Sequence, residues 1–230
     1  PKSPWPDARV PQAASLAIDR QAVNQAETLG FSRLTGSIVP RIFQYAVHFE
    51  PPAYDPARAK KLLADAGYPN GFDGGDFYPF PPSNSMGEAN QGYLQAVGIR
   101  TATRTMERAA YFSAWREKKL HGVILVITAA FGNAATRLEP YVTRNGIYAY
   151  GSLSEIDDLY ARQGRELDPK KREALLGQIQ KILVEKTINV PIYELAFIWG
   201  VGPRVEESGA GLIPGFSYSA PAEDLKLKAR

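Results

Sequence analysis

The chain has 230 residues, of which 44% are hydrophobic and 22% charged, a composition typical of a folded globular protein with a sizeable core. Its 27 basic and 24 acidic residues leave a net charge of +3, and the short basic clusters are interpreted as solvated helix faces rather than a nucleic-acid-binding stripe. The absence of cysteine excludes disulfides, thiolate metal sites and cysteine nucleophiles, and no apolar run approaches the roughly 18 residues of a membrane span.

Helices are predicted in the first half of the chain over residues 13–29, 54–69, 88–97 and 108–117. The second is the clearest, because Asp55 can cap its first turn and Pro56 suits its first position. Gly67 can take the left-handed conformation that ends it. The following stretch, Tyr68–Asn84, is rich in glycine and proline and is interpreted as an irregular surface loop.

Extended segments are predicted over residues 99–106, 121–128 and 189–205. The second of these, "HGVILVIT", is continuously apolar, which favours a strand covered on both faces in a parallel sheet. Two further helices are predicted, one over residues 152–163 with a capping box made by Ser154 and Asp157, the other over residues 167–186 with Asp168 as its cap. Helices alternating with strands predict an α/β fold.

The segment after the apolar run, "AAFGNAATRLEPYV" at residues 129–142, is the main candidate for a functional turn. Phe131, Gly132 and Asn133 directly follow the predicted strand, so we expect this turn to form part of a ligand cleft. Arg137 offers a planar fork of donors suited to a carboxylate or a phosphate. The alternative is a connecting loop in which Asn133 caps the next helix and Arg137 points to solvent.

Three aromatic residues further along the chain are candidates for the same cleft. Tyr148 and Tyr150 have the spacing of one strand face, and Trp199 lies on the extended segment 189–205. Packing within the core or a loop is the alternative for each of them. Trp115, on a short predicted helix, is interpreted as a core residue.

Little in the sequence supports catalysis. The two histidines, His48 and His121, lack the spacing of a metal site, and no G-x-S-x-G elbow occurs. The G-x-G within "GVGPR" lacks the third glycine and the helix of a phosphate-binding loop. The possibility of a catalytic pair of carboxylates, as in glycosidases, stays open, because the sequence alone does not tell which carboxylates face each other across a cleft. We expect a binding protein that is not an enzyme and has no cofactor and no metal.

Several stretches, in this order, resemble the extracellular solute-binding proteins of family 5, the dipeptide, oligopeptide and nickel class that serves ABC importers. They are "DARVPQAASLAIDRQAV", "YDPARAKKLLADAGYPNGF", "QAVGIRTATR" and "ELDPKKREALLGQIQKILVEKTINVPIYE". The resemblance implies an α/β, periplasmic-binding-protein-like (type II) lobe, in which helices flank a mixed sheet. It also implies a periplasmic or membrane-associated extracellular location.

Members of this family are roughly twice as long, so the resemblance implies a C-terminal half. Residues 1–192 would form the ligand-binding lobe, and residues 193–230 would be a crossover strand and tail belonging with the first lobe. The implied partners are the N-terminal lobe of the same protein, a small peptide-like solute and a membrane permease, with no nucleic acid. Two lobes would close on the solute about a hinge, so this chain alone should bind it weakly.

The sequence departs from the family pattern at the candidate turn. Family members commonly carry W-G-A-D-Y-P-D-P there, and matching "RLEPY" to their F-L-x-P-Y puts Ile127 at the tryptophan, Ala130 at the aspartate and Phe131 at the aromatic. That aspartate pairs with a peptide's α-amino group, and a buried ammonium without a partner is costly. The cleft is therefore expected to prefer an anionic or neutral polyhydroxy solute.

One other function stays open, a non-catalytic interaction or scaffold domain with no small-molecule site. A half-protein should expose a broad apolar or aromatic face toward its missing lobe, whereas an independent scaffold should not.

Overall fold

The computed structural model describes residues 3–128, 132–196, 199–212 and 222–229. The helices in these ranges are α1 (Arg9–Ala17), α2 (Arg20–Thr28), α3 (Pro56–Asp65), α4 (Asn84–Ala96), α5 (Arg108–Arg116), α6 (Ala134–Val142), α7 (Ser154–Gln163), α8 (Pro169–Glu185) and the 3-10 helix η1 (Ala222–Asp224). The strands are β1 (Arg33–Leu34), β2 (Phe72–Tyr78), β3 (Ile99–Thr103), β4 (Gly122–Ile124), β5 (Tyr193–Glu194), β6 (Val205–Glu207) and β7 (Lys226–Leu227).

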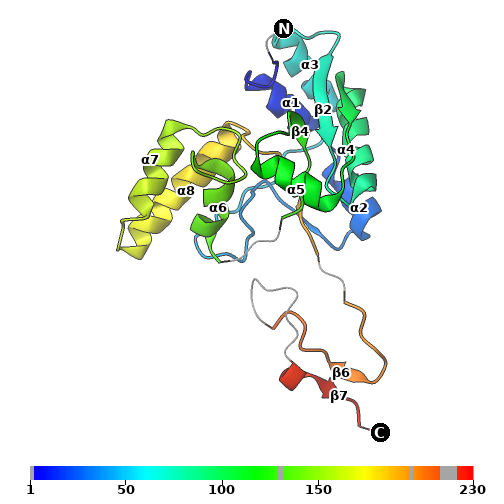
Figure 1. The fold of residues 1–230 in the computed structure, drawn as a ribbon, viewed down its shortest axis with the longest axis vertical. Coiled ribbons are helices and arrows are strands. Elements are labelled where there is room, and N and C mark those ends of the chain that lie inside the picture. Colours follow the sequence, from blue (N-terminus) through cyan, green and yellow to red (C-terminus); the bar gives the residue numbers. More distant parts are fainter. Residues whose placement is uncertain (1–2, 129–131, 197–198, 213–221, 230) are drawn as a thin grey trace.

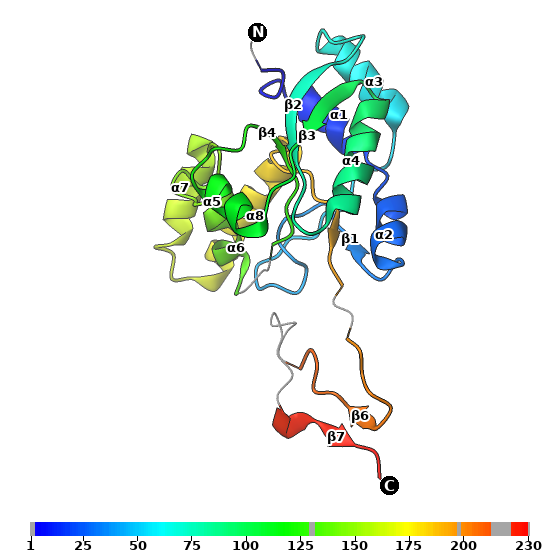
Figure 2. The ribbon, with the colours of Figure 1, turned by 45° about the vertical axis from the view of Figure 1, so that its right-hand side comes forward.

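A parallel sheet of order β3-β2-β4 lies at the centre of the body (Figure 1). Helices α1, α3 and α4 pack a buried apolar core against it, with Val10, Leu63, Phe77, Leu94 and Ile99 among its members. A second core joins α6, α7 and α8, and Figure 2 shows these helices on the opposite side of the sheet from α1 to α4. Two antiparallel ladders, β1–β5 and β6–β7, lie outside this sheet. The predicted α/β class is confirmed.

The expectation of an irregular loop over residues 68–84 is wrong, because β2 is the central strand. Phe72 and Phe77 are both buried in the core against α1 and α3, although they are five positions apart and a regular strand would point them to opposite faces. Between Asp73 and Asp76, β2 advances three residues while its partner β3 advances two. This bulge, where Gly75 has a φ of +81°, restores both rings to one core.

The predicted helices are largely confirmed, with two corrections. The single helix expected over residues 13–29 is two helices, because Ile18 is extended and Asp19 caps α2 by accepting from the Ala22 N–H. The capping box on Ser154 is also wrong. Leu153 is the N-cap residue of α7 and makes no side-chain cap, while the Asp157 carboxylate accepts hydrogen bonds from Arg144 and Ser152.

The predicted strands form, but they are shorter. Strand β4 covers only Gly122–Ile124 and pairs in parallel with β2, as expected. It is an edge strand of the sheet, and both faces of the segment are packed, as expected. Val123 and Leu125 lie against the core that holds α1 and α3, and Ile124 and Val126 lie against a cluster that includes Tyr111 and Trp115. Residues 123–128 are half-buried. Within the described part of segment 189–205, β5 pairs with β1, and Val205 begins β6 on the C-terminal segment that extends away from the body (Figure 1).

Candidate functional site

The candidate site lies where β4 leads to the carboxyl edge of the parallel sheet. Ligands of open α/β sheets bind outside the carboxyl ends of the strands. After the ladder ends, the Leu125 N–H donates to the Tyr78 carbonyl at 3.0 Å, and the chain continues to Thr128. Ala130 and Phe131 lie outside the described residues, and the described part of the turn begins again at Gly132.

Gly132 and Asn133 form the entry to α6. Gly132 is exposed with a φ of +85°, and a Cβ on it would lie 2.5 Å from Thr136 Oγ1, so the turn requires glycine. Asn133 Oδ1 accepts from the Thr136 N–H at 3.2 Å, and Thr136 Oγ1 accepts from the Asn133 N–H at 3.0 Å. This capping box confirms the N-cap interpretation of Asn133. A contact of Gly132 or Asn133 with ligand stays a prediction.

Arg137 lies in the second turn of α6 and is half-buried, so the interpretation that it points to solvent is wrong. Its Nε donates to the Ile38 carbonyl at 2.7 Å and its Nη1 to Thr128 Oγ1 at 2.5 Å. The guanidinium carbon lies 4.5 Å from the centre of the Tyr141 ring. Burial lowers the pKa of Arg137, and Tyr141 opposes this shift.

Tyr148 and Tyr150 do not share a strand face, because residues 143–150 form successive turns in which Gly146 donates to Thr143 and Ala149 to Gly146. The Tyr148 ring packs at 4.2 Å from Trp115 and stacks on Tyr141 at 5.4 Å. Core packing is thus observed for Tyr148, and Trp115 is confirmed as a core residue with 4% exposure.

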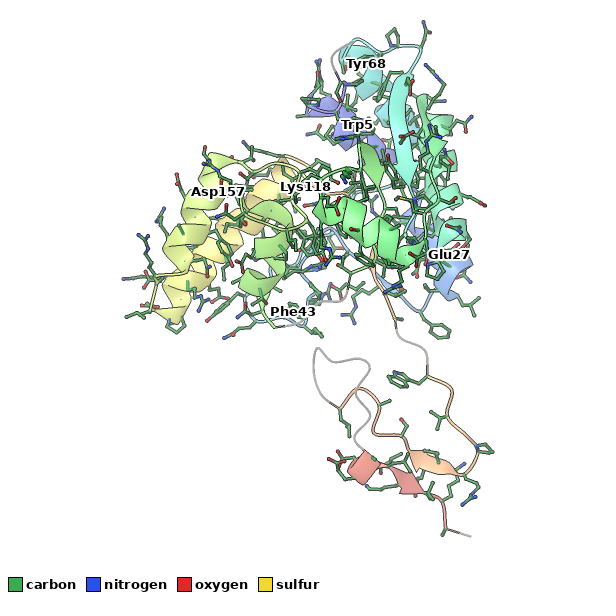
Figure 3. The ribbon with its side chains drawn as sticks, viewed as in Figure 1. Trp5, Glu27, Phe43, Tyr68, Lys118 and Asp157 are labelled. Carbon is green, nitrogen blue, oxygen red and sulfur yellow. The ribbon has the colours of Figure 1, made fainter. Side chains whose placement is uncertain are left out.

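Tyr150 is 44% exposed and its hydroxyl accepts from the Leu120 N–H at 3.1 Å. Lys118, between the α5 and α6 sides of the body in Figure 3, lies 5.4 Å from the Tyr150 ring and donates to the carbonyls of Gly146 and Ile147. Trp199 is 42% exposed on the C-terminal segment beyond β5. Ligand roles for Tyr150 and Trp199 stay predictions.

Sequence reasoning missed the loop that closes against this turn. The Ala134 N–H at the start of α6 donates to the Gln44 carbonyl at 3.0 Å, and Arg137 reaches Ile38 across 99 residues of sequence. Phe43, at the lower edge of the body in Figure 3, is buried in the core of α6 to α8. The apolar spacing of Ile38, Val39 and Phe43 gives no periodic signal that could have predicted these contacts.

A cavity of about 20 Å³ lies behind this loop, lined by Ile38, Gln180 and Asn189 among others. It has room for a water molecule and not for a solute. Across the part of the chain that the structure describes, no cluster of three histidine, aspartate or glutamate side chains could hold a metal ion. None of the helices described has both the length and the apolar character needed to cross a bilayer.

The chain matches the family model "Bacterial extracellular solute-binding proteins, family 5 Middle" over residues 2–149. It is 27% identical to the glutathione-binding protein GsiB of Escherichia coli strain K12 and 26% identical to GsiB of Salmonella typhi, over 98% of this chain and 46% of each relative. The chain therefore spans about half the length of the curated relatives it matches.

Among solved structures, NikA from Brucella suis in complex with Fe(III)-EDTA aligns with a TM-score of 0.77 and 21% identity, over 97% of this chain and 48% of NikA. A dipeptide-binding protein from Pseudoalteromonas sp. SM9913 in complex with Met-Leu aligns with a TM-score of 0.74 and 25% identity, over 84% of this chain and 40% of its own. The family and the fold predicted from the sequence are confirmed.

Proposed function

This chain belongs to family 5 of the bacterial extracellular solute-binding proteins, and we propose on that basis that it is part of the solute-binding component of an ABC importer. The match over residues 2–149 is the observation that carries the proposal. The protein would deliver its solute to a membrane permease from the periplasm, and it would act by binding rather than by catalysis.

The solute would lie between two lobes. Residues 1–192 would form one lobe, and the opposing wall would come from a lobe equivalent to the part of the relatives that this chain does not cover. The turn with Gly132 and Asn133, at the carboxyl edge of the sheet, would face the cleft. Residues 193–230 would cross toward the other lobe, which is supported by the course of the C-terminal segment away from the body (Figure 1).

Exposed apolar side chains around the β1–β5 ladder support a second lobe rather than an independent scaffold. Leu29 and Phe31, which precede β1, are each 69% exposed, and Leu195 follows β5 with 37% exposure. Ile42 is 67% exposed, next to Arg41, whose N–H donates to Glu194 on β5. Apolar side chains gathered at one edge are typical of a surface that meets a partner.

The sequence of the turn fits a peptide-like solute whose amino terminus is not paired with a carboxylate of the protein. Relatives named for glutathione and for dipeptides support the peptide-like class. Ala130 stands where the family's aspartate would pair with an α-amino group, so we propose a preference for anionic or neutral solutes over a cationic terminus. Both glutathione and Met-Leu carry an α-ammonium, but glutathione has two carboxylates and is a net anion at neutral pH, so it suits that preference better than the zwitterion Met-Leu.

Isothermal titration tests this proposal. The chain is joined to its second lobe and titrated with glutathione and with Met-Leu, and the 230-residue chain alone is titrated in parallel. Tighter binding of glutathione by the two-lobed protein, with weak or no binding by the chain alone, is expected. Equal or tighter binding of Met-Leu would contradict the anion preference, and micromolar binding by the chain alone would contradict the two-lobed grip.

A further inference from the structure

We propose that Arg137 is a positioning residue, which fixes Thr128 and the start of α6 against the loop that holds Ile38, without contacting the solute. The inference rests on the proposed solute-binding function, because the position of this turn matters to the solute only if the turn faces the cleft. It differs from the sequence-based hypothesis, in which the guanidinium binds a carboxylate of the solute directly.

The hydrogen bonds of Arg137 join three separate parts of the chain. Nε donates to the Ile38 carbonyl at 2.7 Å, and Nη1 donates to Thr128 Oγ1 at 2.5 Å. Thr128 is the last described residue before the turn, and Arg137 itself lies in α6 after it. Because the guanidinium is planar and rigid, two bonds from it fix both the separation and the orientation of their acceptors.

A column of aromatic rings supports the guanidinium on its face. The guanidinium carbon lies 4.5 Å from the centre of the Tyr141 ring, and Tyr141 stacks on Tyr148 with an interplanar angle of 20°. Tyr148 in turn packs 4.2 Å from Trp115, which is 4% exposed. The Tyr148 N–H donates to the Pro140 carbonyl at 2.8 Å, so the column is anchored to α6. An arginine packed in this way is pre-organised and cannot swing freely toward a solute.

The partners of Arg137 are neutral, namely a carbonyl, a hydroxyl and a ring. No ion pair to Arg137 occurs among residues 3–128, 132–196, 199–212 and 222–229. Burial lowers its pKa, as expected for a cation surrounded by uncharged groups. A lysine offers one ammonium in place of the fork, so it cannot reach both acceptors in the same geometry.

The first test measures amide hydrogen exchange by mass spectrometry in the 230-residue chain. Thr128→Val removes the acceptor and Arg137→Lys removes the fork, and each should speed exchange in residues 132–137 and 36–40 by about tenfold, a loss of one charge-assisted hydrogen bond. Exchange in β3 should stay unchanged. Thr128→Ser keeps the hydroxyl and should restore slow exchange. Arg116→Lys is the matched control, because Arg116 is exposed and its Nε donates to the Phe112 carbonyl within its own helix.

The second test separates positioning from direct contact. Affinities of the two-lobed protein for glutathione and for its diethyl ester, whose carboxylates are masked, are measured with and without Arg137→Lys. Positioning predicts the same fold-loss for both solutes, because the turn moves whatever the solute carries. A loss confined to glutathione, or unchanged exchange in both Thr128→Val and Arg137→Lys, would overturn the proposal. If neither solute binds the parent protein, the proposed solute class fails, and the exchange measurement still decides the role of Arg137.

Discussion

Arg20 Nε donates a 2.8 Å hydrogen bond to the carbonyl of Pro191, which lies 171 residues further along the chain. The same guanidinium donates to the Ser15 carbonyl and to Ser15 Oγ, both at 2.8 Å. Arg20 is 3% exposed, and burial lowers its pKa to about 10. One buried cation thus ties the first two helices to the segment that enters β5.

Arg20→Met should therefore destabilise the fold strongly. The substitution keeps the apolar stem but leaves the carbonyls of Ser15 and Pro191 without their donor, and an unsatisfied buried polar group costs roughly 1–3 kcal/mol. We expect a loss of about 2–4 kcal/mol in the free energy of unfolding, measured by urea denaturation. Arg58→Met, at an exposed position of α3, is the control and should change stability by less than about 0.5 kcal/mol. Equal losses in the two variants would contradict the role of Arg20.

Gly132→Ala should destabilise the turn at the candidate site. A methyl group there would lie 2.5 Å from Thr136 Oγ1, and the φ of +85° is strained for any residue with a side chain. The expected loss is roughly 1–3 kcal/mol in the free energy of unfolding. Gly151→Ala is the matched control, since a Cβ at Gly151 meets open space. A thermal unfolding midpoint that falls equally in both variants would argue against strain at Gly132.

Local signals in the sequence predicted most helix boundaries. Asp55 caps α3 by accepting from the Arg58 N–H, and Asp168 caps α8 by accepting from Lys170 and Lys171, as their spacing before a proline indicates. Such caps depend on residues within one turn, so a sequence displays them directly. The capping box predicted for Ser154 is wrong, because the Asp157 carboxylate accepts a hydrogen bond from the Arg144 N–H, thirteen residues earlier, instead of forming the box.

The features that were missed depend on distant or compensating contacts. Strand β2 was not predicted because Gly74 and Gly75 suggest a loop. The bulge that these glycines permit places the Phe72 and Phe77 rings on the same face, in one core. At the candidate site, the cap of Asn133 was predictable from its neighbours. The partner of Arg137 was not, because no local pattern links Ile38 to a helix 99 residues away.

Tyr160 gives the contact between α6 and α7 a dependence on alkaline pH. Its hydroxyl lies 3.2 Å from the Ala135 carbonyl and 3.3 Å from Glu139 Oε2, and burial, with Glu139, raises its pKa to about 12. The unfolded chain loses this proton near pH 10, so the stabilisation is complete below that pH and is lost as pH rises toward 12. In urea titrations between pH 9 and 11, Tyr160→Phe should therefore show a smaller fall in unfolding free energy than the parent protein. If the unfolding free energy falls equally steeply with pH in both proteins, a group other than Tyr160 causes the pH dependence.

Asn133→Ala tests how much of the turn depends on the cap alone. Asn133 Oδ1 accepts from the Thr136 N–H, and removal of such a side-chain cap costs about 1 kcal/mol. Asn133→Asp keeps the acceptor and places a negative charge at the positive end of α6, so it should be at least as stable as the parent. Ser83→Ala is the control, because Ser83 precedes α4 without making a side-chain cap and should cost little. Urea midpoints rank the three variants. If Asn133→Ala proves as stable as the parent while the affinity of the two-lobed protein for glutathione falls, the main contribution of this amide is to the solute rather than to the helix.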